Sequence, residues 1–172
     1  MPVQKTITLY TYDELSDKAK ERARQWFSAA DVHEAPPSIE DAAQAGLKLD
    51  YGAFDGVQVH AIGGHFTTSA PQCAEYIVAN HGEECDTYKS AKSYLAKLEG
   101  LGEASDDAED EAREAWNEKK EVLDNDFLGA LLSNYQEMIS EELRHLESDE
   151  HAEESILANE YTFRENGERE DI

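Results

Sequence analysis

Apolar residues recur at helical spacing from Ala108 to Leu146, and the rest of the chain has to fold around so long a stretch. The positions are Ala108, Ala112, Ala115, Trp116, Leu123, Phe127, Ala130, Leu131, Tyr135, Met138, Ile139 and Leu146. Steps of three and four residues place such side chains on one face of a helix. The sequence predicts one long helix here, or two helices separated near Asp124-Asn125-Asp126.

The remainder of the chain contains both strand-like and helix-like patterns. Thr6 to Tyr12 alternates β-branched and aromatic residues, as a half-buried strand does. Asp55-Gly56 is a hairpin signal, because both positions of a type I′ turn need positive φ, and it predicts strands at Leu47–Phe54 and Val57–Phe66. Caps and apolar spacing predict helices at Asp17–Ala30, Ser38–Gly46 and Pro71–Asn80. A fourth helix begins after a cap at Asp86 or Thr87, and a fifth runs from a cap at Ser148 or Asp149 to Ala158.

Together these elements predict an α+β fold. The N-terminal strand, the central hairpin and an edge strand at Glu160 to Phe163 form a small antiparallel sheet that helices cover. A chain of 172 residues is long enough for one ordinary domain. We therefore expect an α+β core over residues 1–100 and an acidic helical section over residues 101–172 that packs back on it, as a single domain overall.

The charge of the chain is strongly negative and unevenly distributed. The 39 acidic and 15 basic residues give a net charge of -24, and residues 98–172 carry 25 of the acidic residues. Such a charge repels phosphates, which excludes direct binding to nucleic acid or to anionic lipid. Two cysteines, an N-terminus without a signal-peptide pattern and the lack of an apolar run of about 20 residues predict a soluble protein of the cytoplasm.

Carboxylates are densest between Glu103 and Asp126, where 11 of them occupy 24 residues. At a helical rise of about 1.5 Å per residue this is one carboxylate per ~3.3 Å, close to the ~3.4 Å spacing of phosphates along a DNA strand. The density favours binding to a cationic, nucleic-acid-handling protein, although a solvated helix without a partner and an adaptation to high salt give the same pattern. The candidate partner-binding residues are Asp106, Asp107, Glu109, Asp110, Glu111, Glu114, Glu118, Glu121 and, if its indole is exposed, Trp116.

Metal-binding and catalytic patterns are weaker. His60, His65, Cys73, His81 and Cys85 lie in one third of the chain, and only the spacing of His81 and Cys85 is one that zinc accepts. Glu142-x-x-His145 has the spacing of a di-iron ligand pair, but no second copy exists in the sequence. No nucleophile elbow or phosphate-binding loop is present. We therefore expect neither an enzyme nor a bound cofactor, with His81 and Cys85 as the remaining metal candidates.

Three stretches of the sequence support a family resemblance. They are Tyr10 to Phe27, with the sequence YTYDELSDKAKERARQWF, His81 to Lys92, with the sequence HGEECDTYKSAK, and Ile156 to Phe163, with the sequence ILANEYTF. In these stretches the chain resembles small, acidic, uncharacterised proteins encoded by tailed bacteriophages and prophages. The resemblance implies an accessory protein of the infected bacterial cell, of the kind that inhibits host restriction, CRISPR or recombination machinery, and it supplies no catalytic residues.

These observations predict an inhibitor that binds a host defence protein through an acidic, DNA-mimic-like surface. The alternative is a protein that binds a small molecule or a metal in a pocket between the Val57–Phe66 strand and the Pro71–Asn80 helix. We also expect a homodimer, because the few short helices cannot cover the whole apolar face of the long one.

Overall fold

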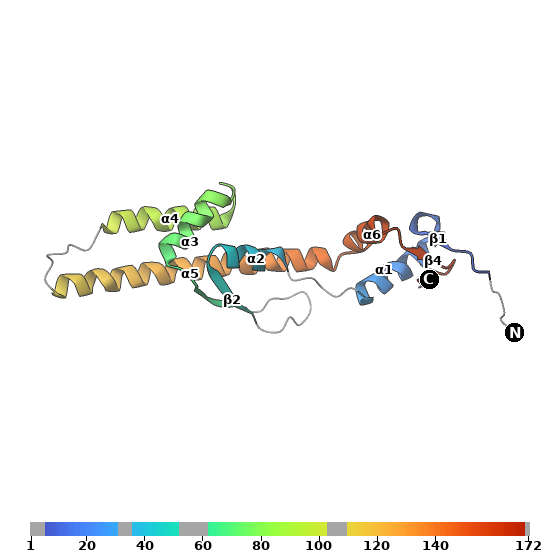
Figure 1. Ribbon diagram of the computed structural model, residues 1–172, viewed down its shortest axis with the longest axis horizontal. Helices are drawn as coiled ribbons and strands as arrows, with labels where there is room; N and C mark the ends of the chain where they lie inside the picture. Colours follow the sequence, from blue (N-terminus) through green and yellow to red (C-terminus); the bar gives the residue numbers. More distant parts are fainter. Residues whose placement is uncertain (1–5, 31–35, 52–61, 103–109, 171–172) are drawn as a thin grey trace. The chain divides into compact units, whose positions relative to one another are not determined.

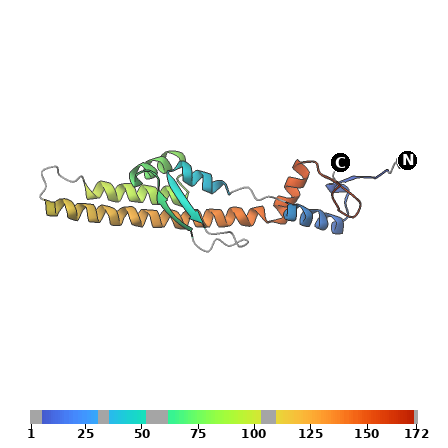
Figure 2. The same ribbon diagram turned by 60° about the horizontal axis from the view of Figure 1, so that its bottom comes forward.

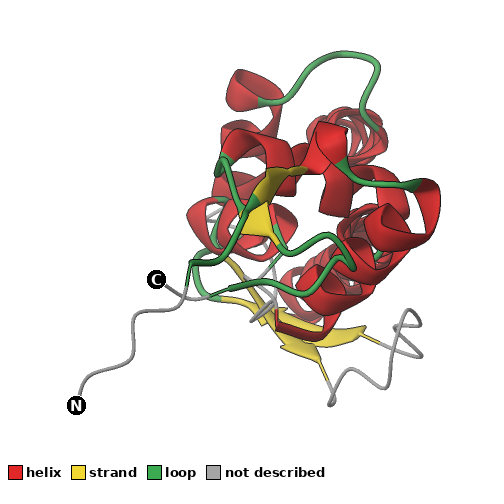
Figure 3. Cartoon of the chain, turned by 90° about the vertical axis from the view of Figure 1, so that its right-hand side faces the viewer, coloured by secondary structure: helices red, strands yellow, loops and turns green. Residues whose placement is uncertain are grey.

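The computed structural model describes residues 6–30, 36–51, 62–102 and 110–170, and its fold is α+β. Helices dominate the described part, and the four strands form two separate antiparallel pairs (Figure 3). The chain divides into two compact units. We call residues 1–34 together with 143–172 the terminal unit, and residues 35–142 the central unit. This division lies elsewhere than the one expected at residue 100.

The terminal unit joins the two ends of the chain (Figure 1). Strand β1 (Tyr10–Thr11) pairs with β4 (Thr162–Phe163), with Tyr10 opposite Phe163. A short 3-10 helix, η1 (Tyr12–Glu14), leads into α1 (Asp17–Ala30), and α6 (Asp149–Ala158) packs against α1. Their shared core consists of Tyr12, Leu15, Ala19, Ala23, Ile156 and Phe163.

Gly167 allows the C-terminal turn to approach α1 closely. Its φ is +83°, and a Cβ there would lie 2.2 Å from the carbonyl oxygen of Ala19. A side chain at this position would therefore have to displace the backbone of α1 as well as adopt a left-handed conformation. The Asn166-Gly167 turn therefore packs directly against α1.

The central unit combines a strand pair with four helices. Strand β2 (Leu47–Tyr51) pairs with β3 (Ile62–Phe66), with Leu47 opposite Phe66. The helices are α2 (Pro37–Gln44), α3 (Ala70–Asn80), α4 (Asp86–Leu101) and the part of α5 (Asp110–Leu146) that ends at Glu142. Helix α4 runs beside α5 in both views (Figures 1 and 2).

Long-range polar contacts fix α2 and α4 on α5. The carboxylate of Glu142 accepts hydrogen bonds from Ser38 N at 3.1 Å and from Ser38 Oγ at 2.7 Å, which caps the beginning of α2. The amide of Asn134 donates to Ser90 Oγ at 2.9 Å. Helix α5 therefore holds both α2 and α4.

The long helix continues through the Asp124-Asn125-Asp126 stretch, so the first of the two predicted forms is observed. Asp124 does not cap a new helix, because its carboxylate accepts from Tyr94 OH and from Lys120 Nζ, both at 2.6 Å. Phe127, Leu131, Tyr135 and Ile139 are buried within the chain, whereas Ala130 and Met138 are half-buried. The four buried side chains are not available to a second copy of the chain, and the homodimer stays a prediction.

The other predicted elements differ from the observed ones mainly at their ends. Only Tyr10–Thr11 of the predicted Thr6–Tyr12 strand pairs in the structure. Helix α4 begins with Cys85 at the N-cap, one residue earlier than predicted, and without a side-chain cap hydrogen bond. The predicted hairpin turn at Asp55-Gly56 lies outside the described residues.

Candidate functional site: an acidic stripe on the long helix

One face of α5 packs against α4. The rings of Tyr94 and Phe127 stack with centroids 4.4 Å apart, and Tyr94 OH donates to Asp124 Oδ1. Burial, together with the hydrogen bond to the Asp124 carboxylate, raises the pKa of Tyr94 and keeps its hydroxyl protonated. This packed face is apolar and specific, and it orients the rest of the helix surface.

The opposite face of α5 carries a row of four exposed carboxylates, which we call the acidic stripe. It consists of Glu111, Glu114, Glu118 and Glu121. Their spacing of three, four and three residues, at about 100° per residue, places them within an arc of about 80°. The centre of this arc lies about 160° from the direction of Phe127, so the stripe faces away from α4.

Basic side chains of the same helix segment lie away from the acidic stripe. Arg113, Lys119 and Lys120 project about 120° or more from its centre. Lys120 pairs with Asp124 on the packed side, at 2.6 Å. Val122 lies about 60° from the centre of the stripe, and its side chain is 60% exposed. The stripe is therefore a segregated negative surface with one apolar side chain at its border.

Six of the nine predicted partner-binding residues lie in the described part of the chain. Glu111, Glu114, Glu118 and Glu121 form the acidic stripe, and Asp110 is exposed at its flank. Trp116 is half-buried on the side facing α4, and its indole N–H donates to the carbonyl oxygen of Gly102 at 3.1 Å. Trp116 therefore ties the beginning of α5 to the end of α4 instead of presenting an exposed anchor. Asp106, Asp107 and Glu109 lie outside the described residues.

The acidic stripe is less dense than the sequence count predicted. Its four carboxylates lie along eleven residues of helix, and neighbouring carboxylates are on average about 5 Å apart along the helix axis. The estimate of ~3.3 Å counted carboxylates on every face of the helix. A partner that contacts one face meets a linear row of negative charges at wider spacing than the phosphates of a DNA strand.

The predicted metal ligands do not converge. Within the described residues no three His, Cys, Asp or Glu side chains are placed to hold a metal ion. Cys73 is fully buried, and burial raises the pKa of its thiol to about 11, so the thiol stays protonated. His65 is exposed on β3, 3.7 Å from Asp50, and His60 lies outside the described residues. Cys85 is an exposed free thiol.

His81 has a different environment from the one expected of a metal ligand. Its Nδ1 lies 2.8 Å from Thr87 Oγ1, and its Nε2 lies 3.3 Å from Asp41 Oδ1. Asp41 also accepts a hydrogen bond from Tyr135 OH at 2.8 Å. Sequence reasoning missed Asp41, because nothing in the sequence places α2 beside the turn that follows α3.

The di-iron spacing has a structural explanation. Glu142 caps α2 through Ser38, as described above, and the ring of His145 packs edge-on against the ring of His151 with centroids 5.3 Å apart. Neither side chain has the surroundings of a metal ligand within the described part of the chain.

No family model, curated protein or solved structure matches the chain. Among the described residues, no helix combines the length and the apolar character that crossing a membrane requires.

Proposed function

We propose that the protein binds a cationic, nucleic-acid-handling protein through the acidic stripe and thereby inhibits it. The observation that carries the proposal is the separation of charge on α5: four exposed carboxylates on one side, and the basic side chains of the same segment at least about 120° away. A helix that carried carboxylates only for solubility would be free to intersperse basic side chains among them on its exposed face.

The physical effect of the stripe is collective. An exposed ion pair contributes at most about 1 kcal/mol, so no single carboxylate decides the affinity. The backbone of the helix that carries these charges is held against α4 by the Tyr94–Phe127 stack, so it does not have to be ordered on binding. The row of like charges also accelerates encounter with a basic surface. Val122 would add an apolar contact at the border of the stripe.

The class of partner follows from the charge and from the sequence resemblance. A linear row of carboxylates complements a surface that normally contacts the nucleic-acid backbone. The resemblance to phage accessory proteins makes a host restriction, CRISPR or recombination protein the partner that we propose. The alternative pocket beside the central hairpin involves residues 57–61, which lie outside the described part of the chain.

A differential capture experiment tests this function. Tagged wild-type protein is compared with a stripe variant, in which Glu111, Glu114, Glu118 and Glu121 are changed to Gln. A control variant carries the same loss of charge at other exposed positions of the central unit, namely Glu75, Glu83, Glu84 and Glu99. We expect a bacterial protein that the wild type and the control retain, that the stripe variant loses, and that duplex DNA displaces. Retention of the same proteins by all three forms would contradict the proposal.

A further inference from the structure

A cavity of about 390 Å³ lies in the central unit, at the turn between α3 and α4. Its wall includes Asp41 of α2, His81 of the turn, and Glu137, Met138 and Glu141 of α5. We call this cavity the histidine pocket. It lies on a different part of α5 from the acidic stripe, and no residue of the stripe lines it.

The charge of the histidine pocket is negative and largely uncompensated. Four carboxylates line it, from Asp41, Asp86, Glu137 and Glu141, and no Lys or Arg is among its described lining residues. Asp86 pairs with Lys89 at 3.2 Å. Glu137 and Glu141 have no ion pair within the described part of the chain. Since they are four residues apart, they project from the same side of α5 and leave negative charge concentrated at the pocket.

His81 supplies a second and independent indication of a ligand. Its side chain is 9% exposed, and its Nε2 is buried without a hydrogen-bond partner. Asp41 Oδ1 is 3.3 Å from Nε2, close enough for an ion pair with a protonated ring, but the arrangement does not form a hydrogen bond. Buried polar atoms are almost always satisfied. One N–H donor beside both atoms would satisfy the nitrogen and the carboxylate together.

The surroundings hold these two acceptors in place. Tyr135 is fully buried and donates to Asp41 Oδ2 at 2.8 Å, which leaves Oδ1 for another donor. Thr87 is buried, and its Oγ1 lies 2.8 Å from His81 Nδ1. A neutral ring that donates from Nδ1 to Thr87 has an unprotonated Nε2, which can accept. With this tautomer, His81 Nε2 and Asp41 Oδ1 form a pair of acceptors 3.3 Å apart.

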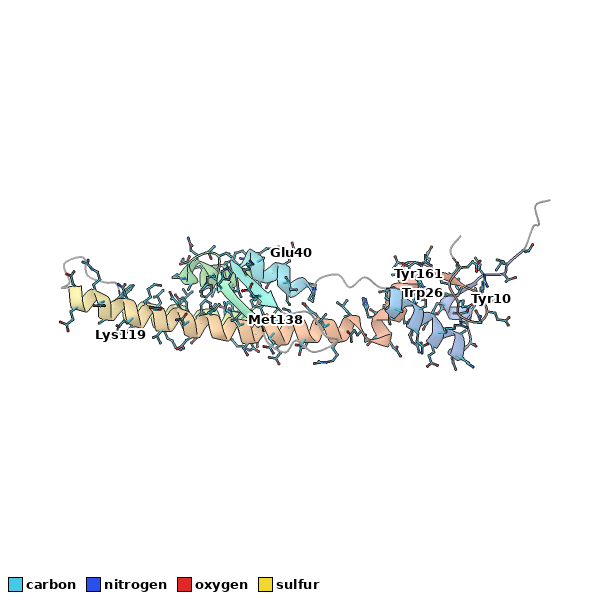
Figure 4. The ribbon with its side chains drawn as sticks, turned by 90° about the horizontal axis from the view of Figure 1, so that it is seen from below. Tyr10, Trp26, Glu40, Lys119, Met138 and Tyr161 are labelled. Carbon is cyan, nitrogen blue, oxygen red and sulfur yellow. The ribbon has the colours of Figure 1, made fainter. Side chains whose placement is uncertain are left out.

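The distribution of the charges indicates the class of ligand. Among the described residues no three ligating side chains are placed to hold a metal ion, and the carboxylates of the pocket lie on separate helices. A chain of methylene groups with an ammonium at each end can reach separate carboxylates and contact Met138 between them (Figure 4 labels Met138 on α5, and on α2 Glu40, the neighbour of Asp41).

We propose that the histidine pocket binds an aliphatic di- or polyamine. One ammonium group donates to Asp41 Oδ1 and His81 Nε2, and a second lies at Glu137 and Glu141. The site is separate from the acidic stripe, so the proposal does not depend on the function proposed for the stripe.

Calorimetric titration of the full chain with spermidine, at about 150 mM salt to screen diffuse attraction, tests the proposal. We expect one saturable site. Changing Glu137 and Glu141 together to Gln should weaken binding by about tenfold or more, because both carboxylates contact an ammonium group. Both side chains are exposed, so this variant keeps the fold, which circular dichroism verifies. The matched control, Glu150→Gln with Glu154→Gln, removes the same charge from an exposed pair of α6 with the same spacing and should leave the affinity unchanged.

Nitrogen NMR of the His81 ring distinguishes a contact in the pocket from diffuse electrostatic attraction, because only a contact changes the Nε2 chemical shift. Spermidine should shift the Nε2 resonance of the wild type, and Asp41→Asn should reduce both the shift and the affinity. Equal weakening by the two double variants, or binding without saturation, would show diffuse attraction to a chain of net charge -24 and overturn the proposal. Displacement of spermidine by Mg²⁺ at equal charge concentration, or an unchanged Nε2 resonance, would overturn it as well.

Discussion

The two faces of α5 differ in what they require of their residues. The packed side is held by the Tyr94–Phe127 ring stack and the Tyr94–Asp124 hydrogen bond to α4, by the Tyr135–Asp41 hydrogen bond to α2, and by fully buried side chains such as Leu131. The acidic stripe on the other side has exposed carboxylates that the fold does not use. One face of the helix thus contributes to the stability of the fold, and the other face is the one that we propose binds a partner. Substitutions on one face should change unfolding, and substitutions on the other should change association.

The largest effect on stability is expected from Phe127→Ala. The ring is buried and stacks on Tyr94, so its removal leaves a cavity and should lower the free energy of unfolding by about 3–5 kcal/mol. Urea denaturation measures this loss. Val122→Ala, on an exposed apolar side chain of the same helix, is the control and should change stability by less than about 0.5 kcal/mol. Similar losses for the two variants would show that the faces are not distinct.

A smaller loss is expected from Tyr94→Phe. This variant keeps the stacked ring and removes only the hydrogen bond to Asp124, which still accepts from Lys120. The free energy of unfolding should fall by about 1–2 kcal/mol. The comparison with Phe127→Ala separates packing from hydrogen bonding on the packed face, and an unchanged urea midpoint would refute the role given to the tyrosine hydroxyl.

The packed face should also respond to alkaline pH. Burial and hydrogen bonds to Asp124 and Asp41 raise the pKa values of Tyr94 and Tyr135 above 10.0, the value of an unperturbed tyrosine. A raised folded-state pKa contributes stability that is complete below pH 10 and is lost as the pH rises through the folded value. We expect the urea midpoint to fall from about pH 10 upward, less steeply in the double variant Tyr94→Phe with Tyr135→Phe. Equal slopes would assign the decline to other groups.

The smallest effects are expected from single changes in the acidic stripe. Glu118→Gln should change the free energy of unfolding by less than about 0.5 kcal/mol and the affinity for the partner by less than about 1 kcal/mol. Lys119→Gln, at a neighbouring position outside the stripe, changes the net charge in the opposite direction and should not weaken binding (Figure 4). A large loss at Glu118 alone would indicate a specific buried contact rather than a distributed charge.

Local sequence signals predicted most of the elements. Apolar spacing placed α1 correctly, and Ser148 and Pro71 marked the beginnings of α6 and α3. The strand pair β2–β3 was also predicted, because alternation is a local property, but its register was not: Leu47 lies opposite Phe66, whereas a two-residue turn at Asp55-Gly56 would place it opposite Gly64.

Long-range packing could not be predicted in the same way. The sequence allowed either a helix break with a cap at Asp124 or one continuous helix. The helix is continuous, and the Asp124 carboxylate accepts a hydrogen bond from the hydroxyl of Tyr94, thirty residues away in the sequence. Trp116 was taken for a candidate anchor because no local signal shows that its indole N–H donates to Gly102. The exposed carboxylates of the stripe were all predicted, whereas Asp41 of the histidine pocket was not, because its contacts are to His81 and Tyr135.

The salt dependence of partner binding tests the role of the acidic stripe most directly. Once a retained protein is identified, its equilibrium binding is measured from about 50 to 300 mM salt for the wild type, the stripe variant and the charge-matched control. We predict that affinity falls steeply with salt for the wild type and the control, and that the stripe variant binds weakly with a shallow dependence. Equal affinities and equal salt dependence in the three proteins would contradict the account.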